Sequence, residues 1–418
     1  MLRHSSTIAL VAIAFSLSRF PALGFGGSPA PQFSKPVDYD PELTGAQYVV
    51  VGDVLHRGIE DLVVTHANDS FGHISLLVGN GDGTFARAKI VYQGTRNNAV
   101  LQARLADANG DGIPDLIMVT TDLAGVAYLT VALGDGHGRF HQAGQTRFND
   151  GPLVIGKFGS DRLPDVFVQA SYAVPAAIYR SNKHGGFSSV QLPYGGGAGG
   201  LIAVDVNHDG NLDLVGIGQS PSLAYPEQLQ TLIGTGNSYF FLPPIYTRPS
   251  LEESQSTGNN TGITAAAGDL RGTGNLDLIV FGSDFQYGLT IGGSVYFGHP
   301  DGSFDPPLLL PLSPKGGLGT AGNGAAIADF NGDGIADIFL TTNASLQPTG
   351  TFVLSGAGDG TFPLELQTLV PIRPLYPHVI AADLNNDSRP DAIVSDQTSN
   401  RGVWVLLNTA TRTRVPNR

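Results

Sequence analysis

The sequence predicts an all-β fold: a seven-bladed β-propeller of four-stranded antiparallel blades, with the N-terminal strand closing the last blade. Three observations support this prediction. A short acidic loop recurs seven times at intervals of about 48 to 64 residues, which suits one four-stranded unit for each repeat. A Gly-Asp-Gly turn recurs in the same register. An N-terminal segment looks like a strand without a unit, and the last unit lacks one strand.

The acidic loop is clearest from residue 329 to residue 340, where the chain reads Asp-Phe-Asn-Gly-Asp-Gly-Ile-Ala-Asp-Ile-Phe-Leu. Oxygen-bearing side chains stand at positions 1, 3, 5 and 9, and the Gly at position 6 permits a sharp turn. The residue at position 7 would add its backbone carbonyl. Ca²⁺ takes about six to eight oxygen ligands, so the loop predicts a calcium site. An EF-hand loop closes with Glu at position 12 between helices, whereas a strand follows here, so this is no EF-hand.

Four copies of the loop are complete, and we expect about four structural Ca²⁺ sites. Their candidate ligands are Asp107, Asn109, Asp111, Ile113 and Asp115; Asp205, Asn207, Asp209, Asn211 and Asp213; Asp329, Asn331, Asp333, Ile335 and Asp337; and Asp383, Asn385, Asp387, Arg389 and Asp391. A single copy could be an Asx-rich turn without metal, but four copies in phase favour the cation site.

Three further copies are degenerate. A weak metal candidate keeps Asp269, Thr273 and Asp277, with Arg271 at position 3. The remaining two copies, which begin at Asp53 and Lys157, keep only two aspartates each. The sequence alone does not decide whether these three loops bind a cation.

The second recurring element is a hairpin turn that ends in Phe. It occurs at residues 80–85, 134–140, 299–304 and 358–362, each time after a short apolar run. Gly and Asp between such runs indicate β-hairpins. Apolar strands are expected at residues 62–64, 116–120, 166–168, 212–217, 276–281 and 338–340. Each unit therefore reads strand, acidic loop, strand, variable loop, strand, turn, strand.

The two ends of the repeat region complement each other. Residues 33–39 resemble the outer strand of a repeat but follow no unit, while the last unit offers strands only at 379–382, 392–395 and 403–407. We therefore expect the N-terminal strand to complete the C-terminal blade, because ring closure removes exposed sheet edges.

Together, the repeated loops and turns resemble the FG-GAP or VCBS repeat family. The resemblance covers nearly everything from about residue 33 to the C-terminus. It implies the β-propeller also seen in integrin alpha subunits, with Ca²⁺ in the loop between the first and second strands of a blade. The first, third and fifth repeats depart from the family pattern.

The domain organisation follows from these repeats and from the composition of the ends. We expect a signal peptide at 1–24, a linker at 25–32, the propeller at 33–410 and a tail at 411–418. The N-terminal segment has a basic start, an apolar stretch and small residues at a cleavage site, so the protein is expected to be secreted, periplasmic or extracellular; a retained N-terminal anchor is the alternative. No membrane span is expected in the mature chain, which should be a monomer.

Composition limits the partners. The net charge of −13 opposes general binding to nucleic acid or to anionic membranes. The chain has no cysteine, so core burial and metal must hold an exported chain together. No catalytic residue is identified: the ten His residues lack metal-ligand spacing, and nucleophile and phosphate-loop motifs are absent.

A ligand face is expected opposite the acidic loops, where the connections vary most in length. Its candidate residues are Arg96, Tyr172, Tyr225, Tyr246, Tyr287, Tyr376 and His378, and Tyr92 is also expected to be exposed there. Aromatic rings with a few polar groups suit a glycan or an extracellular protein. The favoured function is a calcium-stabilised binding or adhesion module. A lyase-like enzyme acting on polysaccharides and a plain scaffold are the alternatives.

Overall fold

The computed structural model describes most of the repeat region. The described residues are 29–43, 45–66, 69, 71–94, 99–148, 153–161, 163–168, 176–192, 200–218, 228–240, 245–247, 264–281, 293–310, 322–342, 350–363, 366–374, 377–397 and 402–410.

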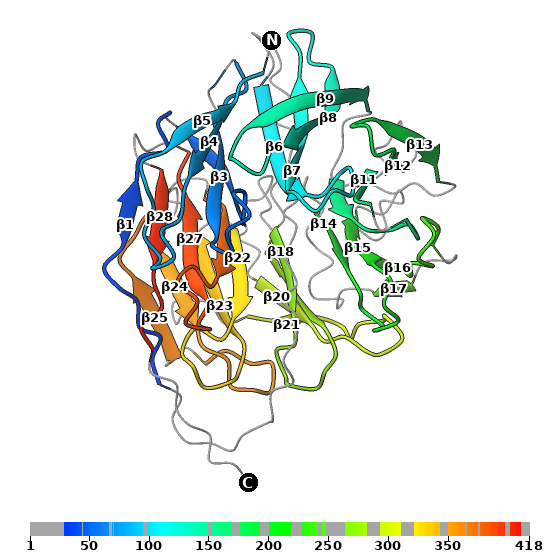
Figure 1. Ribbon diagram of the computed structural model, residues 1–418. Coiled ribbons are helices and arrows are strands. Elements are labelled where there is room, and N and C mark those ends of the chain that lie inside the picture. The colour runs from blue at the N-terminus through cyan, green and yellow to red at the C-terminus, as the bar shows by residue number, and fades with distance from the viewer. Residues whose placement is uncertain are drawn as a thin grey trace.

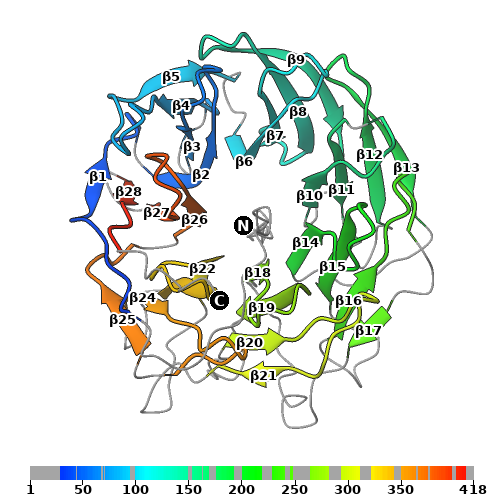
Figure 2. The ribbon, with the colours of Figure 1, turned by 60° about the horizontal axis from the view of Figure 1, so that its bottom comes forward.

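Seven antiparallel sheets of four strands each form a ring, and the described residues contain no α-helix (Figure 1). The seven-bladed β-propeller expected from the sequence is thereby confirmed. The first strand of each blade lies nearest the ring axis and the last lies at the rim (Figure 2). Among the described residues, none forms a long apolar helix of the kind that crosses a bilayer.

The strands follow the repeats in chain order. Blade one comprises β2 (Ala46–Gly52), β3 (Asp61–His66), β4 (Ile74–Leu77) and β5 (Lys89–Tyr92), and blade two comprises β6 (Ala99–Ala106), β7 (Asp115–Thr121), β8 (Ala127–Gly134) and β9 (Phe140–Arg147). Blade three comprises β10 (Leu153–Gly156), β11 (Asp165–Val168), β12 (Ala177–Ser181) and β13 (Phe187–Gln191), and blade four comprises β14 (Gly200–Val204), β15 (Asp213–Gly218), β16 (Gln228–Leu232) and β17 (Ile245–Thr247). Blade five comprises β18 (Thr264–Gly268), β19 (Asp277–Phe281), β20 (Gly293–Tyr296) and β21 (Leu308–Leu309), and blade six comprises β22 (Gly322–Ala328), β23 (Asp337–Thr342), β24 (Thr351–Leu354) and β25 (Gln367–Val370). Blade seven comprises β26 (Val379–Ala382), β27 (Asp391–Ser395), β28 (Val403–Leu406) and β1 (Val37–Tyr39).

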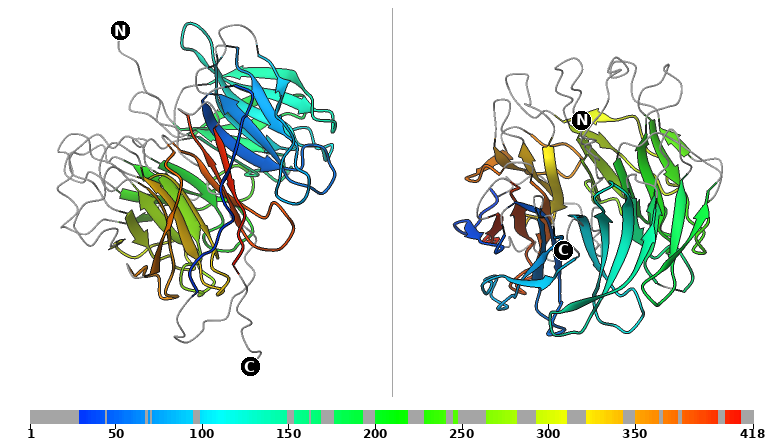
Figure 3. Two further views of the ribbon diagram at one scale, coloured as in Figure 1. Left: turned by 90° about the vertical axis from the view of Figure 1, so that its left-hand side faces the viewer. Right: turned by 90° about the horizontal axis from the view of Figure 1, so that it is seen from above.

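The N-terminal strand closes the ring, as the sequence predicts. β1 pairs antiparallel with β28, with Val37 opposite Val405, and the two strands run side by side in Figure 3. Upstream of β1, an isolated bridge joins Phe33 to Asn408. The two ends of the chain thus share one sheet, and unfolding of either end would open the ring.

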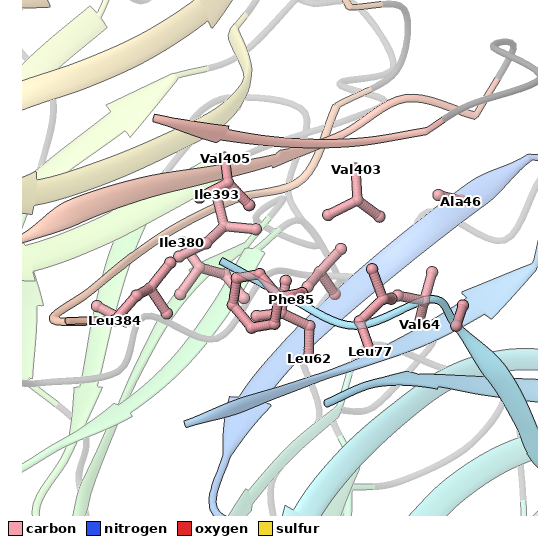
Figure 4. Packing of buried hydrophobic residues seen from close by; sticks show 13 residues of the cluster. Ala46, Leu62, Val64, Leu77, Phe85, Ile380, Leu384, Ile393, Val403 and Val405 are labelled. Carbon is pink, nitrogen blue, oxygen red and sulfur yellow. The ribbon is translucent and has the colours of Figure 1, made fainter. Parts of the chain in front are cut away.

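The apolar core lies between blades. The residues with a described placement form seven buried clusters, one at each junction of neighbouring blades. The middle strands are apolar on both faces because successive side chains alternate: Leu62 and Val64 of β3 pack toward blade seven, whereas Val63 packs toward blade two. Figure 4 shows the cluster at the junction of blades seven and one, where Phe85 and Leu77 meet Ile393 and Val405.

Candidate metal centre

The acidic loops connect the first and second strands of each blade, and in blades one to six they lie beside the hairpin that connects the third and fourth strands. In blade two, the loop runs between β6 and β7, and the Gly134 N–H at the end of β8 donates to Asp115 Oδ1 at 2.8 Å. The loop and the hairpin therefore share one edge of the ring, as the order of elements in the repeat predicts.

The first aspartate of each loop organises the turn. Asp107 accepts hydrogen bonds from three backbone N–H groups, those of Gly110 at 2.7 Å, Asp111 at 3.0 Å and Gly112 at 3.0 Å. Six blades repeat the contacts from positions 5 and 6, through Asp53, Asp107, Asp205, Asp269, Asp329 and Asp383. The loop is thus an Asx-type turn in its own right.

Two positions of the turn adopt positive φ, where the sequence pattern indicated only one. In blade six, Gly332 at position 4 has φ 77° and Gly334 at position 6 has φ 84°. Residues with side chains also adopt this conformation, including His208 at position 4 and Ser388 at position 6. The backbone of the turn is therefore retained even where glycine, which adopts it at least cost, is lost.

The side chains at positions 3 and 5 also form hydrogen bonds within the loop. Asn331 Nδ2 donates to Asp333 Oδ2 at 3.0 Å, and Asp333 Oδ1 accepts the N–H of Ile335 at 2.8 Å. Within the described part of the chain, no three carboxylate or imidazole groups already form a ready-made metal cluster. The donor chemistry nevertheless fits a hard cation, since every loop side chain at positions 1, 3, 5 and 9 of the four complete copies offers oxygen.

The aspartate at position 9 is the feature common to all seven blades. Its side chain is buried in every case, in the set Asp61, Asp115, Asp165, Asp213, Asp277, Asp337 and Asp391. In blade six, Asp337 accepts the N–H groups of Phe330 at 2.9 Å and Asn331 at 3.1 Å through one oxygen, and that of Gly356 at 3.0 Å through the other. The carboxylate joins the acidic loop to the hairpin, and the oxygen that accepts the Gly356 N–H keeps a lone pair for another partner.

Burial raises the pKa of these aspartates. The pKa is raised to about 6 for Asp213 and Asp391, first by desolvation and then by the negative charges at positions 1 and 5 of the same loop. Desolvation raises the pKa of Asp337 well above its usual value, and the charges of Asp329 and Asp333 add to the shift. A cation would relieve this unfavourable charge.

Two of the degenerate loops supply a cation of their own. In blade one, Arg57 Nη2 donates to Asp61 Oδ1 at 2.9 Å and to the Gly79 carbonyl at 3.1 Å. In blade five, Arg271 Nη2 donates to Asp277 Oδ1 at 2.7 Å and to the Gly298 carbonyl at 3.1 Å.

The two arginines come from different loop positions, 5 and 3, and yet their guanidinium groups reach equivalent partners. Arg271 also lies over the ring of Phe297, with 4.4 Å between the guanidinium carbon and the ring centroid. A positive charge beside the position-9 carboxylate is therefore built into blades one and five.

Blades three and seven differ both from the blades in which an arginine pairs with the position-9 aspartate and from the other complete loops. In blade seven, Arg389 contacts the Asp387 carboxylate, and its Nε donates to the Asn408 carbonyl at 3.1 Å. In blade three, Asp165 accepts the Ser181 N–H at 3.2 Å and the hydroxyl of Ser238, from the next blade, at 3.3 Å.

Asp165 gives a test of the cost of burial. Its pKa is raised to about 6, chiefly by desolvation, so the folded state binds more protons than the unfolded state between about pH 4 and pH 6. The stability that it contributes is greatest below pH 4 and is lost as the pH rises through 6. We expect Asp165→Asn to remove this loss. At pH 7 the free energy of unfolding of the variant should exceed that of the wild type by up to about 3 kcal/mol.

Chemical denaturation at pH 4.5 and pH 7.5, in the presence of a chelator, measures the difference in the free energy of unfolding between Asp165→Asn and the wild type. Asp161→Asn, in the same loop but exposed, serves as the control and should retain most of the pH dependence. If the free energy of unfolding changes equally with pH in the wild type and in Asp165→Asn, the expectation is contradicted.

Most of the expected ligand-face residues lie outside the described residues: Arg96, Tyr172, Tyr225, Tyr287 and Tyr376. Tyr246 is in β17, but its side chain also lies outside the described part. Two residues expected to be exposed are buried: Tyr92, with 5% of its surface exposed, packs between blades one and two, and His378, also 5% exposed, lies against Tyr48. Their exposure was predicted wrongly because strand ends next to loops can still face a neighbouring blade.

Sequence reasoning missed the joining role of the position-9 aspartate and the paired arginines. A signal for the first was present, because Asp61 and Asp165 persist in loops that have lost most other ligands. The arginines had a weaker signal, their presence at ligand positions. Three polar residues near the ring axis, Tyr48, Gln102 and Arg104, were also missed, although Gln102 and Arg104 interrupt an apolar first strand.

Comparison with known proteins agrees with this architecture. A family model described as FG-GAP-like repeat matches residues 32–118 and 158–216. Comparison with curated proteins gives no match.

Solved structures share the fold at low sequence identity. A lectin of Agrocybe aegerita that specifically recognises non-reducing terminal N-acetylglucosamine is 18% identical, with a TM-score of 0.54 over 78% of this chain and 80% of the lectin chain. BBS1N, from a crystal of its complex with ARL6DN, is 8% identical, with a TM-score of 0.53 over 92% of this chain and 98% of its own. The chain thus contains FG-GAP-like repeats, and its sheets close into a seven-bladed β-propeller.

Proposed function

We propose that the protein is a secreted, calcium-stabilised binding module for a glycan or an extracellular protein, and that its ions are structural. One observation carries the calcium part of the proposal. In blades one and five an arginine neutralises the buried position-9 aspartate, whereas among the described residues Asp115, Asp213 and Asp337 have no cationic partner within 4 Å. These three aspartates belong to loops that keep all their oxygen ligands.

The two groups of blades satisfy the same requirement in different ways. A buried carboxylate is costly unless it is paired or neutralised. In blade six, Asp329, Asn331, Asp333 and Asp337 would hold Ca²⁺ together with the Ile335 carbonyl, and the corresponding residues would do so in blades two, four and seven. The ion would neutralise the loop and stabilise the folded ring by mass action.

Chelation tests the metal. We expect removal of calcium to lower the melting temperature, because a ligand at 100 times its Kd stabilises the folded state by about 2.7 kcal/mol per site. Asp333→Ala should remove part of the calcium-dependent shift.

Thr273→Ala is the matched control for this experiment. It changes the same loop position in blade five, where Arg271 supplies the positive charge, so the calcium-dependent shift should be that of the wild type. If chelator and Asp333→Ala both leave the unfolding curve unchanged, the loops are not cation sites.

The binding part of the proposal is supported by the fold and by its neighbours. The acidic loops are used to join elements within a blade, which leaves the opposite edge of the ring for recognition. Similar rings serve glycan recognition in the Agrocybe aegerita lectin and occur in a protein complex in BBS1N, at identities that show the fold alone. A glycan array probed with the calcium-loaded protein tests the hypothesis that the protein binds a glycan. Absence of any glycan signal, together with capture of an extracellular protein, would support the hypothesis that the ligand is a protein.

Export is the remaining part of the proposal, and it is supported by the N-terminal sequence pattern, which lies outside the described residues. Sequencing the N-terminus of the protein recovered from the culture medium or the periplasm would test it, with cleavage after residue 24 as the expected result. The proposed module acts as a monomer.

A further inference from the structure

The innermost strand of blade two carries two polar side chains that the repeat does not require. β6 reads Ala-Val-Leu-Gln-Ala-Arg-Leu-Ala, and Gln102 and Arg104 stand two residues apart. The register with β7 is regular from Gln102 to Ala106, so the two side chains share one face of the strand. β6 lies next to the ring axis (Figure 2).

Arg104 carries an unbalanced positive charge. Its Nη1 donates to the neighbouring Ala103 carbonyl at 2.8 Å, whereas its Nη2 is buried without a hydrogen-bond partner. No carboxylate of the described residues lies within 4 Å of the guanidinium, although the chain as a whole is strongly acidic. Arginine stays protonated in proteins, so a partner is required to offset its desolvation.

Gln102 is the second unsatisfied group. Only 1% of its surface is exposed, and neither its Oε1 nor its Nε2 has a hydrogen-bond partner. A buried amide that forms no hydrogen bond destabilises the folded state, because nothing offsets the loss of its contacts with water. Gln102 therefore lacks both a donor and an acceptor partner on the face that it shares with Arg104.

Two further side chains reach this region from other blades. Tyr48 on β2 packs against His378, just before β26, with ring centroids 5.2 Å apart. Burial raises the pKa of Tyr48, and the nearby Arg104 charge partly offsets this shift. Burial, and then the Arg104 charge, lowers the pKa of His378 to about 3, so both rings are neutral at pH 7. Neither provides the missing negative charge.

We propose that Arg104, Gln102, Tyr48 and His378 form a binding site at the ring axis for a carboxylate that carries a neighbouring hydroxyl group. The carboxylate would pair with the guanidinium of Arg104. A hydroxyl would donate to Gln102 Oε1, which an anion without hydrogen cannot do. Arg104 is only partly buried, whereas Gln102 is covered.

The charge of the site selects the class of anion. One guanidinium balances one carboxylate, whereas a phosphate dianion would bring excess negative charge next to two neutral rings. The ligand is therefore a hydroxy acid, either free or as the acid group of a sugar. This site lies apart from the acidic loops and does not depend on whether they bind calcium.

Calorimetric titration of the full chain tests the site with glycolate, acetate and inorganic phosphate as probes. Glycolate is expected to bind more tightly than either acetate or phosphate. D-glucuronate compared with D-glucose then distinguishes a sugar acid from a small free acid, because the two sugars differ only in the carboxylate.

Substitutions connect binding to the proposed residues. Arg104→Met should weaken glycolate binding about tenfold or more, in line with the loss of a charge-assisted hydrogen bond. Gln102→Leu should reduce the preference for glycolate over acetate. Arg147→Met, an exposed arginine on β9 of the same blade, should bind as the wild type does.

Two results would overturn the proposal: no binding of glycolate or glucuronate by the wild type up to about 50 mM, or equal affinity in the wild type and Arg104→Met. Tighter binding of phosphate than of glycolate would overturn the assigned class of ligand. If Arg104→Met does not fold, Arg104→Lys keeps the charge but loses the planar fork, and it should show the same order of probes with weaker binding.

Discussion

Replacing Asp337 by alanine is expected to destabilise the protein by on the order of 3–5 kcal/mol. The substitution removes the acceptor of three backbone N–H groups, those of Phe330, Asn331 and Gly356, and all four residues are buried. Water cannot reach the freed N–H groups without opening the junction between loop and hairpin. The loss should appear as a lower melting temperature and a lower denaturant midpoint.

Two variants separate this role from a general effect of losing an acid. Asp337→Asn keeps one carbonyl oxygen as acceptor and removes a charge that burial disfavours, so it should lose less than Asp337→Ala. Asp359→Ala removes an exposed aspartate from the hairpin of the same blade, where it accepts the Thr361 N–H at 2.9 Å. If Asp337→Ala is as stable as Asp359→Ala, the position-9 aspartate does not hold the blade together.

Gly298→Ala is the second substitution for which we expect a large loss, about 3 kcal/mol or more. A Cβ at this position would lie 2.0 Å from the Leu276 carbonyl oxygen, which belongs to the backbone and cannot rotate away. The shift needed would also disturb the bonds that the Gly298 N–H and carbonyl make with Asp277 and Arg271. Thermal and urea unfolding measure the effect.

Gly274→Ala in the same blade serves as the control. Its Cβ would meet nothing within 4 Å, but its φ is +85°, so only the cost of the left-handed conformation, roughly 1–2 kcal/mol, is expected. A Gly298→Ala variant no less stable than Gly274→Ala would show that the hairpin can move away from the loop at little cost.

The architecture could be predicted in detail because its signals are local. Four copies of the acidic loop are complete within nine residues, and the turn in the structure is held by contacts of the same range, such as Asp107 with the N–H groups of Gly110 to Gly112. The number of loops predicts the number of blades. The N-terminal strand that ends at Tyr39 belongs to no repeat of its own, which predicts its pairing with the last blade, as observed with β28.

The chemistry around the loops could be predicted only in part. The Asp at position 9 was assigned to a metal, and its hydrogen bond to the hairpin was not expected because the partner lies 19 residues away in both blade two and blade six. Arg57 and Arg271 occupy different loop positions. That both guanidinium groups contact the position-9 aspartate depends on side-chain conformation, which the spacing of residues in the sequence does not describe.

The sequence by itself determined the fold, the number of blades, the acidic loops and the strand that closes the ring, because hydrophobic periodicity and turn residues act over a few neighbours. Tertiary structure alone decided that Tyr92 and His378 are buried and that Tyr48 packs against His378. Residues 48 and 378 meet only when the ring closes, and the direction of a side chain between packed blades follows from that closure rather than from local sequence.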